Sequence, residues 1–232
     1  MTCLLKCHSS APQQLTEEWL EPAHWLHTNH HVGSSSGRNK VYFIDFDNQQ
    51  WVLRHYYRGG FIAKFNRDSF LFLGNQRTRA IAEFDLLQAM RKLQLPVPQP
   101  IAARVVRKGL FYKNDILIER FNAKDLHGYL LANTIRKEEW QLLGRTIAEF
   151  HRHKVYHADL NIKNILFDGQ QFYLIDFDRG EFKPSQGRWC QANLDRLLRS
   201  FRKELAKDSN LHWHESDWHS LVSGYQAFMS AK

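Results

Sequence analysis

The chain has 232 residues, of which 43% are hydrophobic and 24% are charged, so it can bury the core of one domain or of two small lobes. Its first residues do not resemble a signal peptide, and no stretch approaches the roughly 18 apolar residues that span a bilayer, so a cytosolic protein is expected. Three cysteines are too few for a disulfide framework, and the formal net charge of +8 favours an anionic partner: a nucleotide, a nucleic acid or an acidic lipid surface.

Residues 1–30 have no clear hydrophobic period, and their tryptophan and leucine residues indicate a short packed arm or strand. A small-residue segment, residues 33–38, then leads into the apolar residues 41–46. Glycines in such a loop let backbone N–H groups approach phosphate oxygens, which makes Gly33 and Gly37 candidate nucleotide contacts. A flexible hairpin loop is an equally good interpretation. A Walker loop is excluded because the glycine spacing differs and a strand follows.

The two apolar segments 41–46 and 51–57 predict antiparallel strands around a polar turn. Side chains alternate between the two faces of a strand, so Arg54 lies on the face opposite to that of its two sequence neighbours. A helix predicted from residue 78 to about residue 93 carries Glu83 near its start. Its carboxylate can reach Arg54 if the helix packs on the sheet.

The segment from residue 54 to residue 79 is rich in both basic and aromatic residues. It contains one acid, Asp68, and six basic residues: Arg54, Arg58, Lys64, Arg67, Arg77 and Arg79. Mixed basic and aromatic surface is typical of contact with an anionic membrane. A small-lobe core with a solvated basic rim is an equally good interpretation.

The proline-rich segment 95–100 ends the helix, and further strands are expected at 101–106 and 115–121. The second of these leads into a connection between lobes, where Glu119 and Phe121 are expected to offer backbone groups to an adenine ring. Helices are then predicted at four places: residues 125–132, 137–153, 193–207 and 213–228.

The most informative stretch, residues 157–178, carries three polar residues at a defined spacing. Asp159 and Asn164 are five residues apart, and Asp176 follows Asp159 by seventeen. Residues 165–175 predict a hairpin with an Asp-Gly turn, which brings Asn164 and Asp176 to the same end of two paired strands. Their oxygens suit Mg²⁺, and Asp159 beside them is placed as a base for an attacking hydroxyl. A hairpin with ordinary polar turn residues is the alternative.

The order and spacing of these residues also match the kinase catalytic-loop pattern H-x-D-L-x-x-x-N and its metal-binding aspartate. With these pieces in place, residues 33–178 resemble the protein-kinase-like superfamily. Most of the chain resembles, more closely, the bacterial 3-deoxy-D-manno-octulosonic acid (Kdo) kinase family of lipopolysaccharide core kinases. The resemblance is carried by these segments: residues 52–56 with 58–60, 95–100, 157–161, 175–180 and 192–200.

The resemblance implies an α+β, protein-kinase-like bilobal fold, with a small β-rich N-lobe over residues 1–121 and a reduced helical C-lobe over residues 122–232. The implied reaction is ATP-dependent phosphorylation of the Kdo sugar of a Kdo-lipid A precursor, with Mg²⁺ as the metal. The implied partners are this lipid-linked acceptor and an anionic membrane surface, with no nucleic acid. The implied location is peripheral, at the cytoplasmic face of the bacterial inner membrane.

The same resemblance implies a role for each motif residue. Asp159 is the catalytic base, and Asn164 and Asp176 are the metal ligands. Arg54 is the phosphate-binding cation and Glu83 its helix partner. The remaining cofactor-binding residues are Gly33, Gly37, Glu119 and Phe121.

The chain departs from the protein-kinase pattern at several positions. Arg54 replaces the usual lysine, and its planar guanidinium contacts phosphates differently from an ammonium group, so Arg58 or Lys64 could act instead. Asn161 stands where protein kinases carry a lysine two residues after the base, and no Ala-Pro-Glu segment follows Asp178. A protein-kinase function is therefore not expected.

The sequence also allows three other functions: a different small-molecule kinase, an inactive nucleotide sensor and a nucleic-acid-binding protein. A heptose, aminoglycoside or choline-type kinase would share the catalytic motif, because the acceptor site lies outside it. A catalytically inactive nucleotide sensor is disfavoured by the intact Asp159, Asn164 and Asp176. Nucleic-acid binding rests on charge alone, without a recognised reading motif. His157 is expected to brace the loop rather than to act in catalysis.

Overall fold

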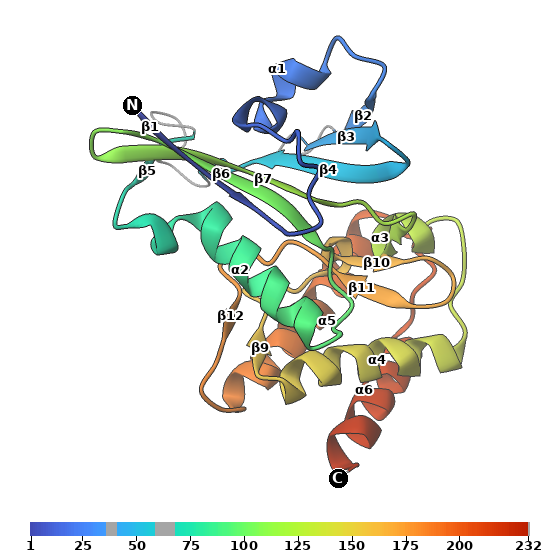
Figure 1. The fold of residues 1–232 in the computed structure, drawn as a ribbon. Helices are drawn as coiled ribbons and strands as arrows, with labels where there is room; N and C mark the ends of the chain where they lie inside the picture. The colour runs from blue at the N-terminus through green and yellow to red at the C-terminus, as the bar shows by residue number, and fades with distance from the viewer. Residues whose placement is uncertain (36–40, 59–67, 232) are drawn as a thin grey trace. The chain divides into compact units, whose positions relative to one another are not determined.

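The computed structural model describes residues 1–35, 41–58 and 68–231. The chain divides into two compact units: unit 1 is Met1–Ala89 with Pro98–Phe121, and unit 2 is Met90–Val97 with Asn122–Lys232 (Figure 1). Unit 1 holds a large β-sheet and unit 2 holds most of the helices. The expected α+β class, with a β-rich N-terminal part and a helical C-terminal part, is therefore confirmed.

Unit 1 is built on one antiparallel sheet with the strand order β1-β6-β7-β4-β3-β2, in which β5 also pairs with β7 (Figure 1). The strands are β1 (Thr2–Cys7), β2 (His31–Ser35), β3 (Val41–Phe46), β4 (Gln49–His55), β5 (Phe70–Leu71), β6 (Pro100–Lys108) and β7 (Phe111–Glu119). The predicted strands 41–46 and 51–57 are confirmed as β3 and β4. Strands β6 and β7 form a long hairpin, because Gly109 takes a φ of 61° and lets Lys108 pair with Phe111 across a two-residue turn.

Strand β2 corrects the expected loop at residues 33–38. Its residues 33–35 pair with β3, with a register shift at Gly33, and this pairing satisfies backbone groups that a loop would expose. Small residues carry little strand signal, so the sequence did not indicate the pairing. Gly37 lies outside the described residues.

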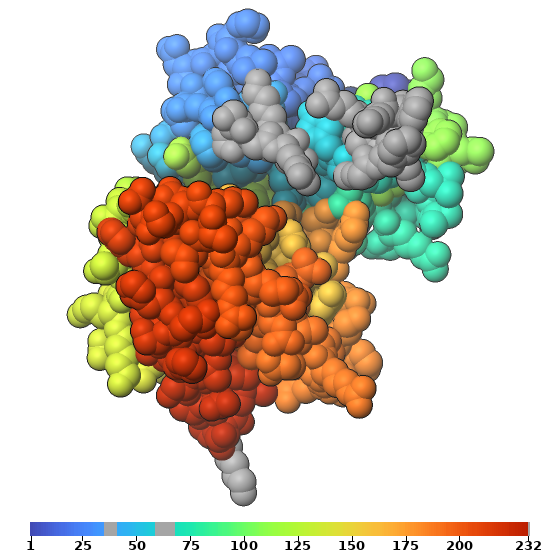
Figure 2. All heavy atoms as spheres, turned by 180° about the vertical axis from the view of Figure 1, so that it is seen from behind, coloured from blue at the N-terminus to red at the C-terminus, as the bar shows by residue number. Residues whose placement is uncertain are grey.

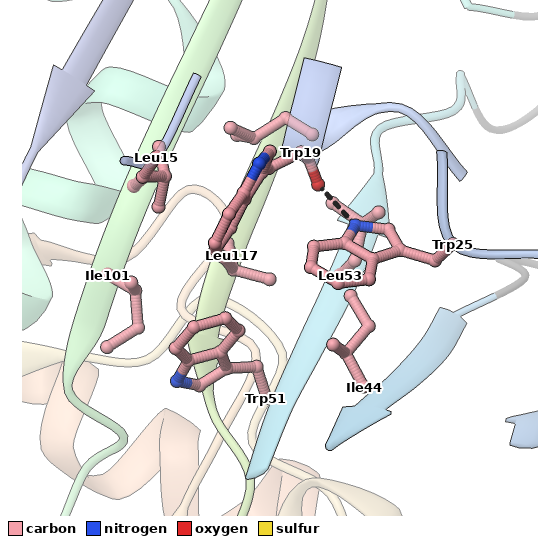
Figure 3. Packing of buried hydrophobic residues seen from close by; sticks show 10 residues of the cluster. Leu15, Trp19, Trp25, Ile44, Trp51, Leu53, Ile101 and Leu117 are labelled. Carbon is pink, nitrogen blue, oxygen red and sulfur yellow. Dashed lines mark hydrogen bonds between the residues drawn. The ribbon is translucent and has the colours of Figure 1, made fainter. Parts of the chain in front are cut away.

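The residues before β2 cover one face of this sheet with an aromatic core. The 3₁₀ helix η1 (Glu17–Leu20) and the short helix α1 (Pro22–Trp25) bring Trp19 and Trp25 onto Trp51 and Leu53 of β4 (Figure 3). Trp25 Nε1–H donates a hydrogen bond to the Trp19 carbonyl oxygen at 2.6 Å, so its buried polar atom is satisfied. The predicted packed arm is thus a segment whose tryptophans pack on one face of the sheet.

Helix α2 (Arg79–Lys92) follows η3 (Asn75–Arg77) and agrees with the helix predicted at 78–93. Its Ile81, Phe84 and Leu87 are buried, as their helical spacing predicts. Glu83 is buried with them, at 2% exposure, and contacts Arg54 on the sheet. A buried carboxylate of this kind is tolerated because it is paired.

Unit 2 contains α3 (Leu126–Leu130), α4 (Lys137–Arg152), α5 (Arg188–Lys207) and α6 (Glu215–Ser230). Helices α4 and α6 approach each other closely at two glycines, Gly144 and Gly224. A Cβ at Gly144 would lie 1.9 Å from the Leu221 carbonyl oxygen, and one at Gly224 would lie 2.1 Å from that of Gln141. Glycine weakens a helix interior, so its presence on both helices reflects this close backbone contact. Among the described residues, no helix is long and apolar enough to cross a membrane.

The four predicted helices are all present, but α5 begins at Arg188, five residues before the expected start at residue 193. Two small sheets complete unit 2: β8 (Lys124–Asp125) with β10 (Ile165–Phe167) and β11 (Phe172–Leu174), and β9 (Val155–Tyr156) with β12 (Glu181–Phe182). The predicted hairpin is confirmed as β10 and β11. In its turn, the Asp168 carboxylate accepts hydrogen bonds from two backbone N–H groups, each at 2.8 Å.

Candidate active site

The hairpin of unit 2 positions Asn164 and Asp176 as the sequence predicts. Beyond the last strand pair, the Ile175 N–H donates to the Asn164 carbonyl oxygen at 3.0 Å, so the two segments stay paired up to the residue before Asp176. Asp176 has a φ of 63°, a left-handed conformation that a non-glycine residue rarely takes. Strained conformations of this kind concentrate at functional sites.

Asp159 lies on the loop between β9 and the 3₁₀ helix η4 (Ile162–Asn164). The Asn164 side-chain amide donates to the Asp159 carbonyl oxygen at 3.0 Å, which joins the expected base and one expected metal ligand. The Asn161 amide donates to the same carbonyl oxygen at 2.9 Å and to carboxylate Oδ2 at 3.3 Å. The Asp159 side chain remains 59% exposed and can meet a substrate hydroxyl.

His157 is buried behind this loop and acts as a brace. Its Nδ1 accepts the Asp159 backbone N–H at 3.1 Å, so Nε2 carries the proton and donates to the Ile175 carbonyl oxygen at 2.9 Å. Burial lowers the pKa of His157, which favours the neutral ring that these two bonds require. One imidazole thereby links the Asp159 backbone to the segment that carries Asp176.

Helix α5 holds the same loop with a polar stripe whose residues were not predicted as part of the site. The Asn193 side chain accepts from the His157 N–H at 3.4 Å and donates to its carbonyl oxygen at 2.9 Å. Ser200 Oγ accepts from the Ile162 N–H at 3.0 Å. Between them, Arg196 Nη1 donates to Asp159 Oδ1 at 3.0 Å. The signal was available, because these three polar residues recur at helical spacing beside an apolar stripe.

The expected phosphate-binding cation lies in unit 1 and is held by two side chains. Arg54 forms an ion pair with Glu83, and its guanidinium lies 4.9 Å from the centre of the Tyr56 ring. The Tyr56 hydroxyl donates to Glu83 Oε2 at 2.6 Å. Burial, followed by the nearby Glu83 charge, raises the pKa of Tyr56 well above its usual value. The structure therefore joins Arg54 to Glu83, as predicted, and adds Tyr56.

The other expected nucleotide contacts lie at several places in unit 1. Gly33 is in β2, and Glu119 ends β7, where its carboxylate accepts the Gln99 N–H at 2.9 Å. Phe121 ends unit 1. The alternative cation Arg58 donates to the Ser69 carbonyl oxygen at 2.5 Å, whereas Lys64 and Arg67 lie outside the described residues.

The donor set at the end of the hairpin fits a hard divalent cation. Asn164 and Asp176 supply an amide and a carboxylate, both oxygen donors, which Mg²⁺ and Ca²⁺ prefer. Across the part of the chain that the structure describes, no group of three or more His, Cys, Asp or Glu residues is arranged around a metal. Two protein ligands supplemented by substrate phosphates are usual for Mg²⁺ in phosphoryl transfer.

Solved structures include kinases with a similar fold. The amicoumacin kinase hAmiN, in complex with AMP-PNP, Ca²⁺ and Ami, superposes with a TM-score of 0.61 at 10% sequence identity. The similarity covers 87% of this chain and 72% of that chain. At this identity it establishes the kinase-like fold and nothing more specific.

Sequence relatives place the chain more narrowly. A 3-deoxy-D-manno-octulosonic acid kinase of Vibrio vulnificus (strain CMCP6) is 44% identical over 209 residues, which are 89% of this chain and 88% of that protein. A protein of the same name from Haemophilus influenzae (strain PittEE) is 40% identical over 219 residues, or 90% of each chain. The family described as Lipopolysaccharide kinase (Kdo/WaaP) matches residues 23–225, and this chain therefore belongs to that family.

Proposed function

We propose that this protein transfers the γ-phosphoryl group of ATP to a hydroxyl of Kdo during synthesis of the lipopolysaccharide core. The observation that carries the proposal is the grouping of Asp159, Asn164 and Asp176 within residues 23–225, the part matched by the family. Relatives named as Kdo kinases match 89% and 90% of the chain, which favours the same acceptor sugar. The reaction is transfer of a phosphoryl group to an alcohol group of the acceptor.

Each residue has a proposed task. Asp159 accepts the proton of the attacking hydroxyl, which requires an exposed carboxylate on a rigid loop. Arg54, oriented by Glu83, binds phosphate oxygens of the nucleotide. A divalent ion, proposed to be Mg²⁺, would be held by Asn164 and Asp176 and would neutralise phosphate charge. The proposed contacts to the rest of ATP come from Gly33, Gly37, Glu119 and Phe121.

Transfer of labelled phosphate to a set of lipid acceptors tests this function. The acceptors are a Kdo-bearing lipid A precursor, the same lipid without Kdo, and a heptose-extended core. We expect transfer to the Kdo-bearing precursor and none to the Kdo-free lipid. Equal activity on the Kdo-free lipid, or activity only after heptose is added, would assign the protein to a different acceptor.

The proposed acceptor is a lipid, so we further propose peripheral docking on an anionic bilayer, at the cytoplasmic face of the inner membrane. In the described residues, the surface that fits best is the tip of the β6–β7 hairpin with the neighbouring β5 (Figure 2, hairpin green and β5 teal). Four apolar side chains there are between 46% and 69% exposed: Leu71, Leu73, Leu110 and Phe111. Three basic residues adjoin them: Arg107, Lys108 and Lys113, of which Lys113 pairs with Asp68.

This hairpin tip combines the two features that hold a peripheral protein on a bilayer. Exposed apolar side chains insert at the interface, and each basic residue near an anionic surface contributes about 1 kcal/mol. The tip also borders a hollow of about 440 Å³ that is lined by Val106, Phe111 and Tyr112 together with Lys108 and Lys113. Its lining suits a phospholipid, which presents an acyl chain and an anionic head group.

Vesicle binding tests the docking proposal. We expect the protein to bind phosphatidylglycerol vesicles but not phosphatidylcholine vesicles. High salt without detergent should release it from the phosphatidylglycerol vesicles. Substituting Leu110→Ser with Lys108→Glu should reduce vesicle binding and lipid phosphorylation together, with ATP affinity unchanged. The control Leu131→Ser removes an exposed leucine of unit 2. Equal vesicle binding by the tip variant and the control would reject this surface, and residues 59–67, which lie outside the described residues, would then be the candidate.

A further inference from the structure

Arg196 lies on the proposed catalytic base although no kinase motif in the sequence called for it. Its Nη1 donates to Asp159 Oδ1 at 3.0 Å, and both side chains are well exposed, at 46% for Arg196 and 59% for Asp159. A guanidinium has five N–H donors in a planar fork. The hydrogen bond to Asp159 uses one nitrogen, so the exposed guanidinium keeps further N–H donors for a ligand beside Asp159.

The loop that carries Asp159 has one lysine of its own, and its side chain is engaged elsewhere. Lys163, which follows the base by four residues, forms an ion pair with Glu204 Oε2 at 3.1 Å. Glu204 is also bound by Lys207 at 2.7 Å, and these contacts, led by the Lys207 hydrogen bond, lower the pKa of Glu204 to about 2. Glu204 therefore remains charged and retains Lys163. Within the described residues, the basic side chain that hydrogen-bonds to the Asp159 carboxylate is Arg196, which comes from a helix, whereas protein kinases present a lysine from the loop.

The exposed side of α5 extends this positive charge away from the base. Arg199 and Lys203 follow Arg196 at intervals of three and four residues, so the three share one side of the helix. Arg199 and Lys203 are exposed, and in the described part of the chain neither makes a hydrogen bond or ion pair. This row of positive charge, formed by Arg196, Arg199 and Lys203, is complementary to an anionic acceptor.

We propose that Arg196 binds the carboxylate of the acceptor sugar, exchanging Asp159 for the substrate as its partner. This inference rests on the proposed function, because Kdo is a sugar acid and most sugar acceptors of kinases are neutral. A planar guanidinium binds a carboxylate through two parallel hydrogen bonds, which exceeds the single bond it makes to Asp159. The acceptor carboxylate is thus the stronger partner.

The test compares a Kdo acceptor with its carboxyl methyl ester, using wild-type protein, Arg196→Ala and Arg196→Lys. A hydrogen-bonded charge pair is worth about 1.5–3 kcal/mol, so wild type should favour the acid by roughly 10- to 100-fold in kcat/KM. Arg196→Ala should raise KM for the acid and bring the acid-to-ester ratio close to one, because the ester offers no charged partner to the guanidinium. Arg196→Lys should restore part of the ratio.

Arg202→Ala is the matched control, because Arg202 is an exposed arginine of the same helix that pairs with Glu215 at 2.7 Å, away from the base. It should keep the wild-type ratio. An unchanged ratio in Arg196→Ala, or equal losses on acid and ester, would overturn the inference and leave Arg196 as a positioning residue only. Wild-type protein that phosphorylates neither compound would instead reject the proposed function, and the inference with it.

Discussion

Asp159 combines an exposed carboxylate with a backbone that is fixed by Asn164 and His157. Replacing its carboxylate by an amide should therefore remove proton acceptance without disturbing the loop. We expect Asp159→Asn to lower turnover by roughly 10²- to 10⁴-fold while nucleotide affinity is kept. Asp195→Asn, an exposed change on α5, is the control. Near wild-type turnover in the Asp159 variant would reject this residue as the base.

Asp176 should behave differently, because its proposed partner is the metal rather than the acceptor. Asp176→Asn retains one oxygen donor but loses the negative charge that attracts a divalent cation. We expect weaker metal-dependent nucleotide binding together with lower turnover. Titration of ATP with and without Mg²⁺ measures this effect, and unchanged metal dependence would contradict the assignment.

Arg54 and Glu83 form one buried pair, so their contributions to turnover should not be independent. Once either partner is lost, the remaining one cannot perform the shared task. The double variant Arg54→Met with Glu83→Gln should therefore lose little activity beyond that of the worse single variant at saturating ATP. Additive losses would mean that the two residues act separately, and would move the phosphate-binding role to Arg58 or Lys64.

At the scale of helices and strands, the close contact of α4 and α6 depends on Gly144 and Gly224. A methyl group at either position would overlap a carbonyl oxygen of the opposite helix, so the backbones must separate. We expect Gly144→Ala to destabilise the protein by about 1–3 kcal/mol despite the better helix propensity of alanine. Urea unfolding measures the loss. Ser223→Ala, next to Gly224 and exposed, should have little effect, and stabilisation by Gly144→Ala would contradict the packing.

Helix α5 is the element that connects structure to the proposed chemistry. Its apolar side contacts the core through Leu194, Leu197 and Phe201, and Phe201 stacks on Trp213 with ring centres 5.2 Å apart. Its polar stripe binds the loop that carries Asp159. A rigid helix thus fixes the loop backbone and leaves the side chains of Asp159 and Arg196 exposed, as their proposed contacts with the acceptor require.

At the scale of the whole molecule, a buried histidine couples folding to pH. Burial lowers the pKa of His151 to about 4, and its Nδ1 lies 2.8 Å from the Tyr225 hydroxyl. In the unfolded chain the ring protonates near pH 6.5. Between these values the unfolded state binds more protons, so stability falls as the pH falls from about 6.5 toward 4, by up to roughly 1.4 kcal/mol per pH unit.

Urea unfolding at pH 7.5 and pH 5 measures this dependence. Wild-type protein should be less stable at the lower pH, and His151→Gln should reduce the difference between the two values, because glutamine does not titrate. His153→Gln, which changes a neighbouring and less buried histidine, is the control. An equal pH dependence in all three proteins would show that His151 does not contribute to it.

The sequence alone determined the parts of this protein that depend on neighbours along the chain. Spacing and turn chemistry placed Asn164 and Asp176 at one end of a hairpin. Alternation in β4 and helical spacing in α2 made a contact between Arg54 and Glu83 possible, and the packing of α2 on the sheet formed it. These features arise within a few residues or from periods that one element imposes, so a single sequence contains them. The family resemblance added the acceptor, which no local pattern contains.

The tertiary structure decided what depends on segments far apart in the chain. It paired β1 with β6, so that Thr2 faces Arg107, and placed the tryptophans of the first residues on the sheet. It also brought Arg196 to Asp159 across 37 residues. Polar side chains on a helix face indicate that the face meets something polar, but not which loop it meets. That choice is made by the packing of α5 into its own core, which sequence periodicity does not encode.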